Sequence, residues 1–525
     1  MAELVETILQ RMGPSLSSDV AAELAKVAHI SPEAARQRLS RARGKVRRLA
    51  GVPFPRNARF LYLEQQFGSP EYWWKLSAEL MLNNSALGFA LAALRQAGGM
   101  IPSRQFPIIC GSPLRQMKHL SADTVLQYLS EAGLVKTVVV PALGECVALV
   151  QEEQYYSVRA ADMRARLLTE DILITAVRDW LRKLGIASYN LVATRSDEQL
   201  PQIGTFVWDL SAPSYLGHMV RFSSGGDTKP GFVACDVNLT ERMTIQGVRP
   251  FIRKCTTLRA LPKVGPCMQI FVADGYEPDA FRALRGAGII AATPASLFGE
   301  EIANALHELT SVLSNVAFSS FEDGRFEELF STLGRIEGAA NQLRGTLFEY
   351  IAADAAKRLG LGDVWMNRIF KVDGKGKAEV DVLAIKANHS VTAIECKGYS
   401  PRATISDELF TRWLQHNVPV AYKGIREHPD WKNLPVTFEF WTTAPISQDA
   451  FALFESAKSQ LNPNRYNIEL RGPVDVWQNC KQTGERSLMT AHQKHFLLPD
   501  GAIPLTVKPE RAVPEFAAVT DDWWN

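Results

Sequence analysis

Two carboxylates and a lysine, set in two neighbouring apolar runs, have residue types and spacing that suit hydrolytic chemistry. Asp381 lies in the β-branched run 380–385, and Glu395 and Lys397 end a second run at 391–397. The stretch between the runs is polar and turn-rich, so the pattern predicts a β-hairpin or near-hairpin. Because side chains alternate along a strand, Glu395 and Lys397 share one face, and Asp381 on the neighbouring strand can join them.

These three side chains suit phosphate chemistry at a bound metal. Two converging carboxylates can hold a hard divalent cation, and Mg²⁺ typically takes one or two carboxylates together with substrate phosphate oxygens. We therefore expect Mg²⁺ at Asp381 and Glu395, with Mn²⁺ as a substitute. The ammonium of Lys397 can orient a water molecule and offset charge that develops on a phosphate. The alternative is a solvent-facing ion pair on an edge strand. The apolar neighbours of both acids disfavour it, because unpaired acids in such strands are costly.

A third acid, Glu349, lies upstream on a predicted helix. Residues 343–356 carry apolar side chains spaced four apart, which indicates a helix. Glu349 falls on another stripe of this helix, together with Gly345, Ala352 and Ala356. Because this stripe has almost no side-chain bulk, we expect it to approach a sheet closely and to direct Glu349 towards the strand carboxylates.

A glutamate on a helix, an aspartate on one strand and Glu-x-Lys on the next resemble the PD-(D/E)XK nuclease superfamily, and most of all its Mrr-like restriction endonucleases, relatives of Holliday-junction resolvases. The resemblance covers roughly residues 340–400, or 310–480 with the elements that follow. It implies a metal site of Asp381 and Glu395, a catalytic Lys397 and an accessory acid, Glu349. Val380 replaces the proline that gives the motif its name, as it does in many members.

Length and composition indicate a soluble globular protein of three or four domains, and the order of predicted elements together with the resemblance implies a mixed α/β class. The chain has 525 residues, 46% of them hydrophobic and 22% charged, which are ordinary values for a soluble protein. The sequence contains no run of about twenty apolar residues, so no membrane span is predicted. The first residues lack the features of a signal peptide. The seven cysteines are scattered, without a C-x-x-C pair, so neither a disulfide framework nor a zinc ribbon is expected. We expect a cytoplasmic location.

The first domain, residues 1–68, is predicted to be helix-turn-helix-like and basic. Ser31 and Pro32 suit the N-cap and first position of a helix that would continue to Arg48. This predicted recognition element carries the candidate nucleic-acid-binding residues Arg36, Arg38, Arg41, Arg43, Lys45, Arg47 and Arg48. The alternative is a solvated basic helix face.

The second domain, residues 69–160, is predicted to be winged-helix-like. A helix at 122–132 precedes two predicted strands, 134–140 and 146–150, joined by a turn at 141–145. Such a domain can bind DNA or dock a protein, and its composition does not decide between the two.

The third domain, residues 161–305, repeats the order of elements expected in the nuclease domain, residues 306–525. We therefore expect a degenerate endonuclease-like fold, in which Asp209 matches Asp381 and Asp236 begins a triplet that matches Glu395 to Lys397. Asn238 stands where the lysine would be, so this copy is expected to be inactive. An unrelated α/β domain with a similar order of elements is the alternative.

The predicted function is that of a metal-dependent endonuclease that hydrolyses phosphodiester bonds in DNA. The resemblance adds a role in bacterial restriction or antiphage defence. The alternatives are a non-catalytic DNA-binding regulator on the same scaffold and a junction-resolvase-type repair nuclease. The expected partner is nucleic acid, DNA in preference to RNA, and no membrane. A homodimer is compatible with this prediction. So is a partner protein that supplies an NTPase or sensing function, since the chain has no P-loop. Residues 374–377 are predicted to form only a hairpin turn.

Overall fold

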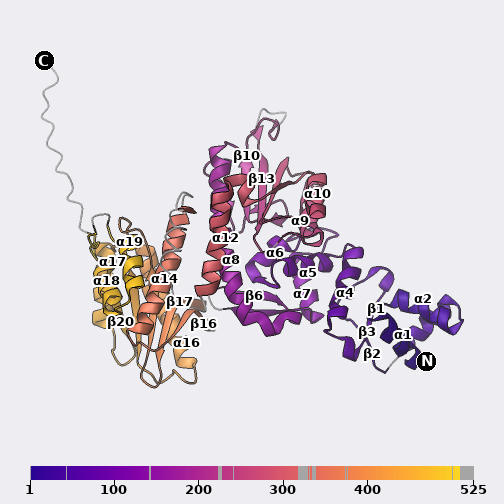
Figure 1. The fold of residues 1–525 in the computed structure, drawn as a ribbon, viewed down its shortest axis with the longest axis horizontal. Helices are drawn as coiled ribbons and strands as arrows, with labels where there is room; N and C mark the ends of the chain where they lie inside the picture. Colours follow the sequence, from indigo (N-terminus) through magenta and orange to yellow (C-terminus); the bar gives the residue numbers. More distant parts are fainter. Residues whose placement is uncertain are drawn as a thin grey trace, which may run out of the picture. The chain divides into compact units, whose positions relative to one another are not determined.

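The chain divides into two units. The computed structural model describes residues 2–42, 44–140, 143–222, 228–240, 242–316, 329, 332–333, 339–372, 374, 376–498 and 501–508. Unit 1 comprises residues 1–320 and 331–337, and unit 2 comprises residues 321–330 and 338–525. Helices and several small sheets are present (Figure 1), which confirms the mixed α/β class. Within the described ranges, we find no helix with the length and apolar character that a membrane crossing requires.

The N-terminal region of unit 1 combines three helices with a small antiparallel sheet of strand order β1-β3-β2. Its elements are α1 (Ala2–Met12), β1 (Ser15–Leu16), α2 (Ser17–Ala28), α3 (Pro32–Arg41), β2 (Val46–Arg48), η1 (Pro55–Asn57), β3 (Phe60–Leu63) and η2 (Glu64–Gln66). Helix α3 begins as predicted, because the side chain of Ser31 accepts a hydrogen bond from the backbone N–H of Ala34 and Pro32 follows it.

The predicted continuation of α3 to Arg48 is wrong. The helix ends at Arg41, after which Ala42 is extended and Gly44 has a φ of +91°. A left-handed backbone at Gly44 cannot continue an α-helix. The chain then turns back as β2, which pairs with β3, so Arg47 and Arg48 lie on a strand. Arg43 lies outside the described residues.

The second region of unit 1 repeats this arrangement, with an antiparallel sheet of order β4-β6-β5. Its elements are α4 (Pro70–Leu82), α5 (Ala86–Gln96), β4 (Met100–Pro102), η3 (Ser103–Gln105), α6 (Phe106–Ile109), α7 (Ala122–Glu131), β5 (Val135–Val140), β6 (Gly144–Leu149) and η4 (Val150–Tyr155). The predicted helix and strand pair are present as α7, β5 and β6. Residues 141 and 142 of the predicted turn lie outside the described residues.

The third region of unit 1 is built around a five-stranded sheet of order β15-β14-β13-β10-β7. Its elements are α8 (Tyr156–Lys183), β7 (Ala193–Thr194), β8 (Gln202–Ile203), β9 (Phe206–Val207), β10 (Leu210–Ser214), β11 (Arg221–Phe222), β12 (Thr228–Lys229), β13 (Gly231–Asn238), α9 (Ile245–Arg259), β14 (Cys267–Ala273), α10 (Pro278–Gly286), β15 (Ile290–Ala292), α11 (Pro294–Phe298) and α12 (Glu300–Val316). Trp208 and Asp209 lie between β9 and β10. Helices α8 and α12 pack side by side (Figure 1).

Unit 2 contains a five-stranded sheet of order β16-β17-β18-β19-β20. Its elements are α14 (Ala339–Arg358), β16 (Asp363–Val372), β17 (Gly376–Lys386), β18 (Ser390–Lys397), α15 (Asp407–Arg412), the π-helical turn η5 (Trp413–Asn417), α16 (Val418–Glu427), β19 (Val436–Thr442), α17 (Gln448–Gln460), β20 (Asn467–Arg471), α18 (Pro473–Gln482) and α19 (Arg486–Phe496). Strands β17 and β18 form the predicted hairpin. Gly374 and Gly376 precede or begin β17 with positive φ angles, while residue 375 between them is not described.

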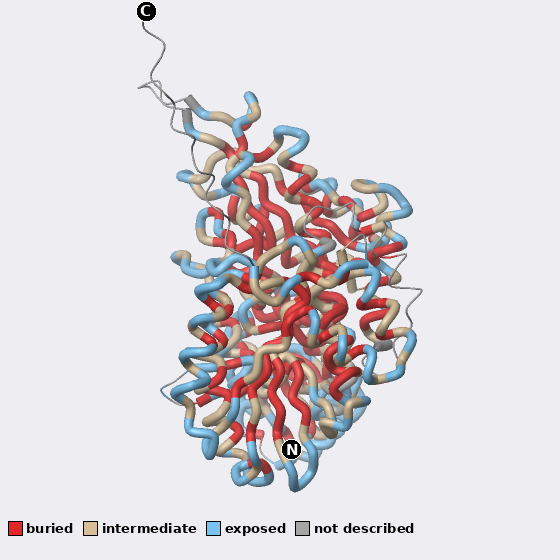
Figure 2. The backbone as a smooth tube through the Cα atoms, turned by 90° about the vertical axis from the view of Figure 1, so that its left-hand side faces the viewer, coloured by how far each residue is buried: buried red, intermediate tan, exposed pale blue. Residues whose placement is uncertain are grey.

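The two large sheets have one topology. In each sheet a long helix precedes the first strand. The first two strand pairings are antiparallel and the next two are parallel. Helices connect the parallel strands, as parallel pairing requires. Helix α8 corresponds to α14, and the strands β10 and β13 correspond to β17 and β18. The strands of these sheets run through the buried interior of their units (Figure 2). The order of elements that the sequence suggested for residues 161–305 is therefore repeated in the sheet topology.

Candidate active site

The hairpin of β17 and β18 brings Asp381, Glu395 and Lys397 together. Val382 pairs with Ile394, so the same register continued by one residue sets Asp381 across from Glu395. The Nζ atom of Lys397 lies 2.7 Å from a carboxylate oxygen of Glu395 and 3.7 Å from one of Asp381. The three side chains are only 15%, 11% and 18% exposed. A buried cluster of two carboxylates and one ammonium results, in contrast to the solvent-facing ion pair of the alternative.

The charges in this cluster are poorly balanced. Burial and the neighbouring carboxylate of Glu395 raise the pKa of Asp381 to about 6, although Lys397 acts in the opposite direction. Burial alone would lower the pKa of Lys397, but the two carboxylates outweigh it and raise that pKa. The carboxylate of Asp381 is held in place because its Oδ2 accepts a hydrogen bond of 2.7 Å from the backbone N–H of Cys396. The site thus holds more negative charge than one lysine neutralises.

Glu349 acts on the same cluster from α14. Burial raises the pKa of the Cys396 thiol, and the charges of Asp381 and Glu349 raise it further. Helix α14 packs against β16, β17 and β18, so Glu349 lies on a helix that adjoins the strands of the cluster. The charges of all four predicted catalytic residues therefore act on the thiol of Cys396.

The expected reason for the close approach of α14 is only partly right. Ala352 and Ala356 are fully buried, but a Cβ atom on Gly345 would meet nothing within 4 Å. The close contact lies at Gly398, directly after Lys397, where a Cβ atom would be 2.6 Å from the carbonyl oxygen of Arg344 on α14. The glycine that permits the approach is therefore on the strand side of the interface.

The cluster fits a magnesium ion that completes its coordination with water and substrate. Within the described part of the chain, no three His, Cys, Asp or Glu side chains come close enough together to hold a metal ion by themselves. Mg²⁺ does not need three, since it usually binds through one or two carboxylates and retains water or phosphate oxygens. Asp381 and Glu395 would supply this pair, and a cation between them would offset both the burial of Asp381 and the charge of Glu395, which raise its pKa.

The middle sheet carries an acidic pair in the corresponding place. Leu210 pairs with Cys235, so Asp209 lies across from Asp236 when the register is continued by one residue. The Oδ2 atom of Asp209 accepts a hydrogen bond of 2.8 Å from the backbone N–H of Val237. Asp381 accepts the same bond from Cys396 in unit 2. The pair Asp209 and Asp236 thus reproduces the geometry of Asp381 and Glu395.

Basic side chains from other elements form ion pairs with Asp209 and Asp236. Lys254 on α9 places its Nζ atom 2.5 Å from Asp236, 3.0 Å from the carbonyl oxygen of Ile108 and 3.9 Å from the ring centre of Trp208. The expectation that Asn238 leaves this copy without a cation is wrong, because Lys254 supplies one from another element. Lys254 is 1% exposed, so a phosphodiester cannot reach it.

Arg195 neutralises the other acid of the pair. Its guanidinium lies 3.2 Å from Asp209, 3.0 Å from Glu170 and 2.8 Å from Asp171. Burial raises the pKa of Asp209 to about 7, which Arg195 counteracts. Sequence reasoning missed both cations. Lys254 was visible as a lysine among the apolar residues that form the buried face of α9, whereas the spacing of Arg195 gave no signal.

The basic residues of the first domain have different surroundings. Arg36, Arg38, Arg41 and Lys45 are exposed on α3 and the turn that follows it. Arg47 forms an ion pair of 2.9 Å with Glu64. Arg48 donates to the carbonyl oxygens of Leu39 and Ala42 and thereby caps the C-terminus of α3. Of the predicted set, the residues on α3 and Lys45 remain suited to contact a phosphate backbone.

Comparisons with family models, curated proteins and solved structures gave no match to this chain.

Proposed function

We propose that unit 2 is a metal-dependent nuclease that hydrolyses phosphodiester bonds in DNA. The observation that carries the proposal is the buried cluster of Asp381, Glu395 and Lys397, in which the pKa of one acid is raised to about 6. Such an arrangement is costly for the fold, and perturbed acids of this kind are concentrated at functional sites. A role in restriction or antiphage defence follows from the resemblance of the motif alone and belongs to this proposal.

Each side chain has a role in the proposed reaction. Asp381 and Glu395 would hold Mg²⁺, which when bound lowers the pKa of a coordinated water and polarises a phosphate oxygen. Lys397, whose Nζ lies 2.7 Å from Glu395, would orient the attacking water and offset negative charge on the phosphate. Glu349 would accept a hydrogen bond from a water at the edge of the site.

The other regions support a protein that acts on nucleic acid. We propose that the two N-terminal regions are winged-helix folds, because each combines helices with a two-stranded ribbon and a short third strand in the same order. In the first, α3 presents Arg36, Arg38 and Arg41 to solvent, as a recognition helix would. The middle region is proposed to be a degenerate nuclease fold, in which Lys254 and Arg195 occupy the space of the metal.

A cleavage assay with the full-length chain tests the proposal. Linear, supercoiled, single-stranded, methylated and branched DNA, together with RNA, are incubated with Mg²⁺ or Mn²⁺. Asp381→Ala, Glu395→Ala and Lys397→Ala should each reduce the rate by roughly 10²- to 10³-fold or more, as the loss of a preorganised electrostatic group does. Lys386→Ala removes an exposed lysine from the end of β17 and is the matched control.

Metal binding is measured separately, by calorimetric titration of Mn²⁺ into the wild type and Asp381→Ala. The variant should lose the site while its circular dichroism spectrum stays unchanged. Wild-type cleavage by Lys397→Ala, or unchanged Mn²⁺ binding by Asp381→Ala, would contradict the assignment.

A further inference from the structure

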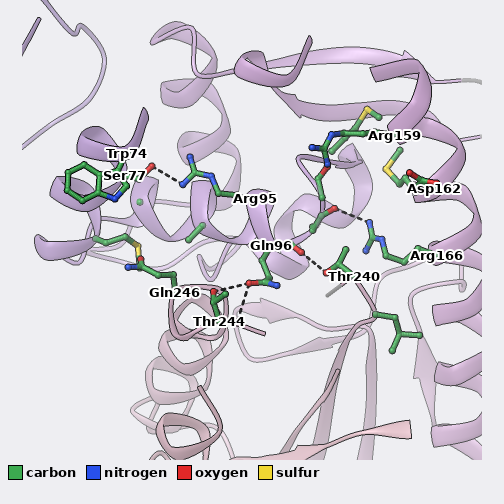
Figure 3. A pocket seen from close by; sticks show the side chains of 18 of the residues that line it. Trp74, Ser77, Arg95, Gln96, Arg159, Asp162, Arg166, Thr240, Thr244 and Gln246 are labelled. Atoms are coloured by element: carbon green, nitrogen blue, oxygen red, sulfur yellow. Dashed lines mark hydrogen bonds between the residues drawn. The ribbon is translucent and has the colours of Figure 1, made fainter. Parts of the chain in front are cut away.

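A cavity within unit 1 lies apart from both acidic pairs. Its volume is about 800 Å³, and side chains from α4, α5, α8, α12 and the start of α9 line it (Figure 3). Clefts of this size commonly hold small-molecule ligands. The wall combines apolar side chains such as Met81 and Met163 with hydroxyl and amide groups such as those of Thr240 and Gln246.

The charges around this cavity favour an anion. Three arginines line it, namely Arg95, Arg159 and Arg166, and among its described lining residues Asp162 carries the only carboxylate. Glu170, which is not a lining residue, pairs with Arg166 at 3.0 Å. Arg95 donates to the hydroxyl of Ser77, and Arg159 donates to the carbonyl oxygen of Gly98. These contacts fix the two guanidinium groups at the cavity wall.

A helix N-terminus adds further positive potential. Helix α9 has 15 residues and starts at the cavity, where Thr244 is its N-cap and Gln246 lies in its first turn. The first turn of α9, all of whose residues are described, carries no acid that would offset the positive end of the helix dipole. Gln96 accepts hydrogen bonds from the backbone and the hydroxyl of Thr244 and so holds this helix end against α5. Anions bind well at such an end.

An aromatic ring completes the site. Trp74 on α4 lines the cavity although it is 68% exposed, an unusual setting for such a large apolar side chain. In Figure 3, Trp74, Arg95 and Gln246 lie at one end of the cavity, and Arg159, Asp162 and Arg166 lie at the other. One end therefore offers a stacking surface beside a cation, and the other offers a second cation.

We propose that this cavity binds a free nucleotide of one or two residues, with the base on Trp74 and phosphate at the arginines and the start of α9. A nucleotide combines the flat ring and the negative charge that these side chains would recognise. The site lies in unit 1, whereas the proposed nuclease cluster lies in unit 2.

Binding is tested with the full-length chain by fluorescence anisotropy of labelled ATP and labelled cyclic diadenylate. Unlabelled mono- and dinucleotides, adenosine and inorganic phosphate serve as competitors. A nucleotide should displace the probe at concentrations at which adenosine or phosphate alone does not. Trp74→Ala and Arg95→Ala should each weaken binding on the order of ten-fold, since the first removes the stacking surface and the second removes a cation that binds phosphate. Both residues are exposed, so the fold should survive these substitutions.

Arg115→Ala, which removes an exposed arginine that does not line the cavity, is the control and should bind like the wild type. Failure of every nucleotide to bind, or equal affinity of Trp74→Ala and the control, would overturn the proposal. So would displacement that strengthens steadily with the length of a DNA strand, because the site would then belong to a polynucleotide. None of these outcomes depends on cleavage, so the nuclease proposal is tested independently.

Discussion

Replacing Asp381 by asparagine should stabilise unit 2 at neutral and alkaline pH. The carboxyl has a pKa of about 6 in the folded protein against an ordinary value of 3.8. Its proton is therefore bound more tightly in the folded chain. The resulting stabilisation is complete below pH 3.8 and is lost as the pH rises to about 6 and beyond. Asparagine stays neutral, and its carbonyl oxygen can still accept the hydrogen bond from the N–H of Cys396.

The pKa difference sets the size of the effect. One pKa unit corresponds to 1.36 kcal/mol, so the ionised Asp381 costs the fold at most about 3 kcal/mol above pH 6. This value already includes the favourable contact with Lys397, because that ammonium acts on the same pKa. We expect the free energy of unfolding of Asp381→Asn to equal that of the wild type near pH 4. At pH 8 it should be higher than that of the wild type by up to about 3 kcal/mol.

Urea unfolding of the full-length chain at pH 4, 6 and 8 measures this difference, with hydrogen exchange of peptides from β17 and β18 as the local readout. Asp363→Asn, which neutralises an exposed acid at the start of β16, is the control and should show no such pH dependence. A variant less stable than the wild type at every pH would refute the account of a repulsive, undercompensated acidic pair.

Addition of Mg²⁺ separates the electrostatic argument from the metal assignment. Mg²⁺ at 100 times its dissociation constant should stabilise the wild type by about 2.7 kcal/mol. Asp381→Asn should respond much less, because it retains only one carboxylate of the pair. Equal stabilisation of both proteins would place the metal elsewhere, even if the pH dependence holds.

Three further predictions concern the rest of the chain. Lys254→Met should destabilise unit 1 by about 3–5 kcal/mol in urea unfolding, because it leaves Asp236 buried without its cation. Lys263→Met, at an exposed lysine, is the control and should be neutral. An equally neutral Lys254→Met would show that unit 1 does not need the ion pair for its stability. Gly398→Ala should lower both cleavage and the thermal midpoint, because the added methyl group would lie 2.6 Å from the Arg344 carbonyl oxygen. Gly345→Ala, at a glycine of α14 without a positive φ and with nothing within 4 Å of its Cβ, is the control and should change neither. Replacing Arg36, Arg38 and Arg41 by alanine should flatten the slope of log K against log salt by about 0.9 for each phosphate that is no longer neutralised, and an unchanged slope would assign α3 to a solvated surface.

Much of the candidate site could be predicted from the sequence because it is local. Asp381, Glu395 and Lys397 lie within 17 consecutive positions on a single hairpin. The alternation of side chains along a strand then determines which of them share a face. The start of α3 was equally local, since Ser31 and Pro32 act within one helical turn. Adjacent covalent bonds and backbone hydrogen bonds control these features, so a short stretch of sequence specifies them.

Only the tertiary structure decided which charges meet in the interior. Lys254 on α9 pairs with Asp236 on β13, 18 positions away in the sequence. Arg195 forms ion pairs with Glu170 on α8 and with Asp209 just before β10. The end of α3 was also a tertiary matter, because pairing of β2 with β3 outweighed the helical preference of the basic run. Similarly, α14 approaches β18 closely because of Gly398, and Gly345 on the helix itself plays no part. A buried charge takes whichever partner the packing of distant segments brings to it, and no local spacing in the sequence records that partner.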